Sequence, residues 1–144
     1  MNFQDTDEQQ PEQQDIPIYS KWVILGFSIL VSPLVGAILL MINLRSVGFK
    51  KQATGVLLFT IGYLFLVSIV LSSVLKLPPN STLTELTRNK PFIIYSLVAQ
   101  IIGGGILAEY FYKKYFPADN YRYKSIWAPL AIMFIIMLAL SLIR

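Results

Sequence analysis

The sequence contains no cysteine and no histidine. Without cysteine the chain forms no disulfide and has no thiolate to act as a nucleophile or a metal ligand. Without histidine it lacks the side chain that most often performs acid–base catalysis near neutral pH, and the usual ligands of zinc and haem are missing as well. No nucleophile–base pair or cluster of metal ligands is visible. We therefore expect no cofactor, no metal and no enzymatic activity.

Charge is the second scarce feature. Charged residues make up 14% of the sequence and hydrophobic residues 55%, whereas a soluble domain carries roughly 25% charged residues. The missing charge is absent from four long blocks, and little sequence outside them is left to form a separate soluble domain. The composition therefore predicts an integral membrane protein with the lipid bilayer as its first partner.

Each block has the length of a membrane span. A helix rises about 1.5 Å per residue, so about 20 apolar residues cross the roughly 30 Å hydrocarbon core of a bilayer. The connection between the first two blocks is short, which favours an antiparallel pair of helices. The sequence predicts an all-α membrane protein of four transmembrane helices packed as two antiparallel hairpins. The predicted spans are 22–44, 53–75, 91–112 and 126–143.

The first 20 residues have a different composition. They are rich in glutamine and acidic residues, and such a segment buries too little apolar surface to offset the entropy of ordering. We expect 1–20 to be a disordered acidic tail and 21–144 to be the four-helix transmembrane domain.

Small and polar residues recur at helical spacing within the spans. Four of them in the first span lie within roughly 80° of one another on a continuous helix, and such stripes let helices approach closely in lipid. Pro33 lies in the middle of this span and is expected to kink it. In the second span, Gly62 shares a stripe with Gly55 and Ser73 that suits contact with the first helix. The packing candidates of the first span are Ser28, Ser32, Gly36 and Asn43.

The third span contains the triplet Gly103-Gly104-Gly105 one turn after Gln100. Glycine costs about 1 kcal/mol relative to alanine in a soluble helix, but in lipid it marks close contact between helices. A side-chain amide without a hydrogen-bond partner is costly in the middle of a span, so the Gln100 side chain is expected to face another helix and not lipid. We predict that Gln100, Gly103 and Gly104 form the tightest helix contact, with Gln100 in an interhelical hydrogen bond.

Glu109 could suggest a proton relay. It lies about 180° around the helix from Gln100 and four residues before Lys113, a spacing that favours an ion pair. We predict an interfacial Glu109–Lys113 pair.

Residues 110–124 interleave tyrosine and phenylalanine with lysine and arginine. In a soluble domain this pattern is compatible with nucleic-acid binding, but between two spans it is typical of an aromatic belt with basic anchors. We therefore expect no nucleic-acid partner. Seven lysines and arginines fall in the first and third connections and five on the other side, which weakly favours both termini outside. The predicted interfacial anchors are Trp22, Arg45, Lys50, Lys51, Lys113, Lys114, Arg122, Lys124 and Trp127.

Two runs carry a family resemblance: residues 32–37 (SPLVGA) with the following Asn43-Leu44-Arg45, and residues 123–130 (YKSIWAPL). They resemble small four-span inner-membrane proteins of bacteria, a group with no attached activity. The resemblance implies a multi-pass protein of the bacterial inner membrane.

Two functions remain open on these grounds. The first is an accessory or assembly protein that binds another membrane protein or a second copy of itself through its helix faces. The alternative is a small transporter or channel with a path at an oligomer interface, lined by Gln100, Asn43 and serines. The absence of ionisable residues in mid-span favours the first.

Overall fold

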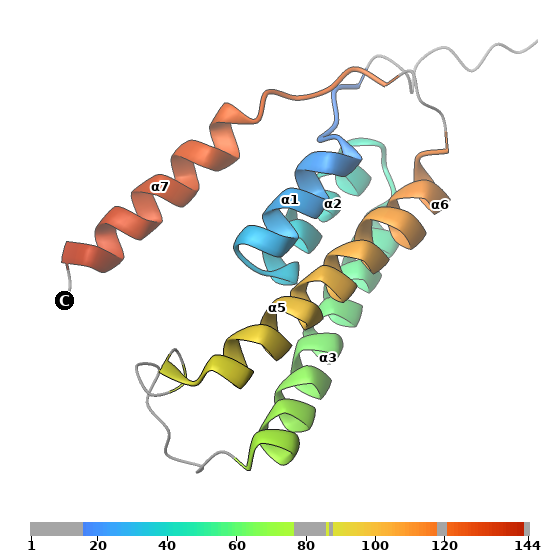
Figure 1. Ribbon diagram of the computed structural model, residues 1–144. Helices are drawn as coiled ribbons and strands as arrows, with labels where there is room; N and C mark the ends of the chain where they lie inside the picture. The colour runs from blue at the N-terminus through green and yellow to red at the C-terminus, as the bar shows by residue number, and fades with distance from the viewer. Residues whose placement is uncertain (1–15, 77–85, 87, 118–120, 143–144) are drawn as a thin grey trace, which may run out of the picture.

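The structure, a computed structural model, describes residues 16–76, 86, 88–117 and 121–142 of the 144. Within these residues the protein is all-helical, apart from one isolated parallel bridge between Ile18 and Tyr123. Figure 1 shows the helices as a bundle with the last helix at one side. They are α1 (Lys21–Leu30), α2 (Pro33–Ser46), α3 (Lys50–Leu75), α5 (Lys90–Gly105), the π-helix η1 (Ile106–Tyr112), α6 (Lys113–Tyr115) and α7 (Trp127–Leu142).

The predicted first span is wrong as a single helix. Pro33 lacks an amide hydrogen and disfavours a helical conformation at the residue before it, and Ser32 is extended, with φ −171° and ψ 157°. The chain reverses here, so α1 and α2 lie side by side as an antiparallel hairpin (Figure 1). We call this pair the α1–α2 hairpin. Its helices contain 10 and 14 residues, each too short to cross a bilayer.

In the part of the chain that the structure describes, two helices are long and apolar enough to cross a membrane, namely Lys50–Leu75 and the continuous run Lys90–Tyr115 formed by α5, η1 and α6. They correspond to the predicted spans 53–75 and 91–112. The fourth predicted span, 126–143, is represented by the 16 residues of α7. The prediction of four transmembrane spans is therefore not supported, because among the described residues two helices are long and apolar enough to cross a membrane.

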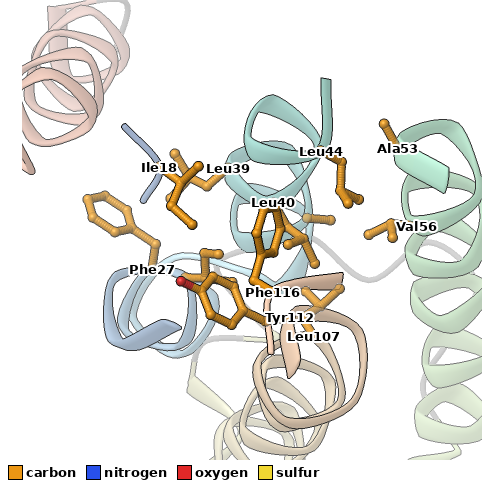
Figure 2. Close-up of a cluster of buried hydrophobic side chains, with 12 residues drawn as sticks. Ile18, Phe27, Leu39, Leu40, Leu44, Ala53, Val56, Leu107, Tyr112 and Phe116 are labelled. Carbon is orange, nitrogen blue, oxygen red and sulfur yellow. The ribbon is translucent and has the colours of Figure 1, made fainter. Parts of the chain in front are cut away.

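The described core lies where the α1–α2 hairpin packs against α3 and η1. Figure 2 shows side chains from these elements converging, with Ile18 beside Leu39. Ile18 is fully buried, so residues 16–20, predicted as part of the disordered tail, are ordered. The physical reason is that the tail's last residues are apolar and find partners on α2. Residues 1–15 lie outside the described residues.

The predicted second hairpin, with the fourth helix against the third, is also wrong. After α6 the chain returns across the end of the bundle, and backbone hydrogen bonds join Ile18 to Arg122 (2.9 Å) and to Lys124 (2.7 Å). α7 therefore starts on the side of α1 and runs apart from the bundle in Figure 1. Near its start Pro129 is buried, and Leu130 and Met133 pack against the core.

The third predicted span contains a feature that the sequence did not indicate. Residues 106–112 form a π-helix, whose wider turn changes which side chains share a face. Leu107 and Tyr112, five residues apart, are both buried in the core, whereas Glu109 is exposed.

Candidate functional site

Ser28 lies where three helices meet. Its hydroxyl donates a hydrogen bond of 2.7 Å to the carbonyl oxygen of Ile24. Facing it from α2 is Gly36, where an added Cβ would overlap the Ser28 hydroxyl and lie 2.9 Å from the Ile24 oxygen. From α5, Gly104 approaches so closely that its Cβ would lie 2.7 Å from the Cβ of Ser28. Ser28, Gly36 and Gly104 therefore pack against one another, with Ser28 and Gly36 facing each other across the hairpin.

The turn of the hairpin lies at the middle of both long helices. A Cβ on Gly103 would be 2.9 Å from Cγ of Pro33 and 2.7 Å from Cε1 of Tyr63. The Tyr63 hydroxyl donates a 2.6 Å hydrogen bond to the carbonyl oxygen of Ala99, which joins α3 to α5. Ser32 stands at the start of α2 without a side-chain capping bond. Gly103 is thus a packing residue, and the hairpin reaches half-way along the bundle.

Asn43 fixes the extended segment that precedes α1. Its side chain is fully buried. The amide oxygen accepts from the backbone N–H of Tyr19, and the amide nitrogen donates to the backbone carbonyl of Tyr19, both at 2.8 Å. Asn43 therefore satisfies both polar groups of one residue in the way that a neighbouring strand would. The sequence placed Asn43 on a packing face but gave no indication of this partner.

One face of α3 has no partner among the described residues. Gly55, Gly62 and Ser73 are exposed, and a Cβ added to either glycine would meet nothing within 4 Å. The predicted contact of this stripe with the first helix is therefore wrong, because α2 packs on the opposite face through Ala53 and Val56. We call the Gly55–Gly62–Ser73 stripe the open face of α3.

Gln100 lies less than one turn before Gly103, at the level where the hairpin ends. It is half-buried. Within the part of the chain that the structure describes, its amide has no hydrogen bond, so the predicted interhelical bond is not found there.

A pocket of about 670 Å³ opens at the end of the bundle where α1 begins and α6 ends. Three segments build it: the first residues of α1, the end of η1 with α6, and the chain leading into α7. Ser20, whose hydroxyl oxygen accepts from the N–H of Val23 at 3.3 Å, begins α1 at its rim. We call this cavity the basic pocket. Its lining residues are Ser20, Lys21, Trp22, Val23, Tyr112, Lys113, Phe116, Pro117, Tyr123, Lys124 and Ile126.

Glu109 lies beside the pocket between two lysines. Its carboxylate pairs with Lys113, which confirms the predicted ion pair, and with the ammonium of Lys21 at 2.9 Å. The Lys21 partner could not be found from the sequence, because the two residues are 88 positions apart.

The predicted anchors all lie at this same end of the bundle. Here α1, α3 and α7 begin and α2 and α6 end. Only Lys124 among them is partly buried, and its ammonium lies 5.3 Å from the centre of the Tyr19 ring. The exposed anchors are Trp22, Arg45, Lys50, Lys51, Lys113, Lys114, Arg122 and Trp127.

No protein family, curated protein or solved structure gives a significant match to the chain.

Proposed function

We propose that the chain is a multi-pass integral protein of the cell membrane, the bacterial inner membrane on the resemblance described above, with α3 and the α5–α6 run as crossing helices. The exposure of the two long helices supports a location in the membrane. In the most apolar windows of the two helices, 11% and 22% of residues are buried, whereas the core helix of a soluble protein is mostly buried. The apolar side chains that point outward need lipid or another protein around them. α7, which is apolar on every side, enters the membrane as a further helix.

The α1–α2 hairpin enters the membrane from one side and returns. Pro33 contacts Gly103, twelve residues from the end of the Lys90–Tyr115 run, so the hairpin turn lies near the middle of the bilayer. Leu30, at this turn, is 82% exposed, as suits a side chain in hydrocarbon.

This path changes the expected orientation. It moves Lys21 and the N-terminal segment to the side of the α2–α3 connection, so that eight lysines and arginines lie at that end and three described ones at the other. Basic connections stay in the cytoplasm, so we place residue 16 and the α2–α3 connection there. The eight are Lys21, Arg45, Lys50, Lys51, Lys113, Lys114, Arg122 and Lys124, and the three are Lys76, Arg88 and Lys90.

Within the membrane the protein binds a helix of another membrane protein or of a second copy, as an accessory or assembly factor without enzymatic activity. The open face of α3 is the observation that carries this proposal. Small residues on a lipid-exposed helix surface let another backbone approach closely, and van der Waals contact then stabilises the pair. Gln100 adds support, since an amide at mid-span is stabilised by a hydrogen-bond partner.

The transport alternative loses two of its lining residues. Both polar atoms of the Asn43 amide form hydrogen bonds with the backbone of Tyr19, and the Ser28 hydroxyl donates a hydrogen bond to the carbonyl oxygen of Ile24. Both are fully buried by their own chain. A polar path would need side chains free to bind the moving solute, so the geometry favours the interaction role.

A cysteine at Gly62 tests the proposal, because the chain has no other cysteine. Oxidation in native membranes is expected to give a disulfide-linked pair if the partner is a second copy. A short thiol-reactive photo-cross-linker on the same cysteine is expected to give an adduct of defined mass if the partner is another protein.

Ile61→Cys is the matched control. Ile61 is also exposed but points about 100° away around the helix. Cross-linking at residue 62 and not at residue 61, abolished by Ser73→Leu, supports the open face as an interface. Equal cross-linking at both positions, or none at either, contradicts it.

A further inference from the structure

We propose that the basic pocket binds the phosphate of an anionic phospholipid headgroup. Three lysines from three separate segments line it: Lys21 at the start of α1, Lys113 at the start of α6 and Lys124 before α7. Lysines that line one cavity suit a phosphate, which accepts several charge-assisted hydrogen bonds at once. The lipid source rests on the proposed membrane location, whereas the phosphate chemistry does not.

Counted over the residues that the structure describes, the pocket carries excess positive charge. Glu109 is the only acidic residue among those that the structure describes, and it pairs with Lys21 and Lys113. In the described residues no carboxylate lies within 4.0 Å of Lys124, whose ammonium instead lies over the Tyr19 ring. Three ammonium groups against one carboxylate leave a field that attracts an anion.

Aromatic walls distinguish a lipid from a soluble phosphate. Trp22, Phe116 and Tyr123 line the same pocket. Trp22 is 70% exposed, and the Lys21 ammonium lies 5.0 Å from the centre of its ring. Free phosphate has no apolar part to contact such walls, whereas the glycerol and first acyl carbons of a phospholipid do.

The position of the pocket along the crossing helix agrees with the level of a lipid headgroup. Lys113 lies in the last turn of the Lys90–Tyr115 run and Phe116 directly follows it, and the end of a crossing helix lies at the level of lipid phosphates. Basic pockets between helices on the cytoplasmic side are typical sites for anionic headgroups.

Trp22 provides a direct readout. The chain has two tryptophans, so Trp127→Phe leaves Trp22 as the single tryptophan of the purified full-length protein in neutral detergent, and excitation that selects tryptophan reports on it. Dihexanoyl phosphatidylglycerol is titrated as the probe, with dihexanoyl phosphatidylcholine and inorganic phosphate in parallel. We expect a saturable change in Trp22 emission with phosphatidylglycerol, a far weaker one with phosphatidylcholine, and loss of affinity as salt is raised.

Lys124→Gln is expected to lower the affinity about fivefold, the effect of removing one lysine near an anionic surface, and Lys124→Arg is expected to retain it. Lys51→Gln is the matched control, because Lys51 is exposed at the same end but does not line the pocket. If Lys124→Gln lowers the melting temperature, Lys124→Arg and the salt dependence of the parent protein still decide the question.

The outcomes separate the two proposals. No saturable response, equal responses to both lipids, or equal losses in Lys124→Gln and Lys51→Gln overturn the anionic headgroup site. Saturation by inorganic phosphate at the same concentrations overturns the lipid source and assigns the pocket to a soluble phosphate. Carbonate extraction of cell membranes tests the membrane location by itself: a chain that stays in the pellet but gives no response overturns this inference alone.

Discussion

Pro33 touches Gly103, with Cγ of the proline 2.9 Å from where a Cβ on the glycine would lie. The proline marks the point where the α1–α2 hairpin turns, and the glycine is near the centre of the 26-residue run Lys90–Tyr115. The contact therefore sets how far the hairpin reaches. Replacing Gly103 by any larger residue would require the hairpin turn, or Tyr63, to move.

Glycine positions that look alike in the sequence are expected to respond differently. Gly104→Leu should lower the thermal stability in detergent, because its side chain would collide with Ser28, and overpacking costs about 1–3 kcal/mol. Gly105→Leu should leave the melting temperature nearly unchanged, since a Cβ there meets nothing within 4 Å. Equal losses in the two variants would contradict the three-helix junction at Ser28.

Asn43→Leu is expected to destabilise the protein by about 1–3 kcal/mol, because it leaves the N–H and the carbonyl of Tyr19 without their partners in a buried place. Ser46→Ala serves as the control, since Ser46 is exposed and loses one bond to the Asn43 carbonyl. Thermal melting of the two purified variants measures the loss of stability in each. A change at Asn43 no larger than that at Ser46 would show that residue 19 is not held by this amide.

Gln100→Leu is expected to leave the melting temperature of the isolated chain unchanged, in contrast to Asn43→Leu. The Gln100 amide has no hydrogen bond among the described residues, so nothing within them is lost on substitution. In native membranes, however, the same variant should reduce cross-linking at residue 62 if the partner satisfies the amide. A clear fall in the stability of the isolated chain would show that Gln100 is bonded within its own chain.

The path of the chain can be read from single cysteines at Pro17, Ser46 and Lys76, all exposed. Because the α1–α2 hairpin returns to its side of entry, we expect Pro17→Cys and Ser46→Cys to be shielded from an impermeant thiol reagent in intact cells and Lys76→Cys to be labelled. A continuous first span predicts another pattern, with residues 17 and 76 on one side and residue 46 on the other. Labelling after permeabilisation confirms that each cysteine is reactive.

The sequence by itself determined the helices and their apolar character, because both depend on composition and spacing within a short window. α3 begins three residues before the predicted span 53–75 and ends with it, and the run Lys90–Tyr115 contains the predicted 91–112. The Glu109–Lys113 pair was predictable for the same reason, since the two residues share one helix surface. Pro33 likewise predicted a local break in the helical geometry, interpreted from the sequence as a kink, because its effect on the preceding residue and on the hydrogen-bond ladder is local.

Only the tertiary structure decided whether that break is a kink or a reversal. The answer depends on whether Gly36 and Ser28 can approach across a turn, and on whether Gly103 and Gly104 leave room for the hairpin against α5. The Lys21–Glu109 pair, the Asn43–Tyr19 bonds and the basic pocket each join segments far apart in the chain. No periodicity within a single helix specifies such contacts, because they form only after the chain has reversed at Ser32 and returned across the end of the bundle after α6.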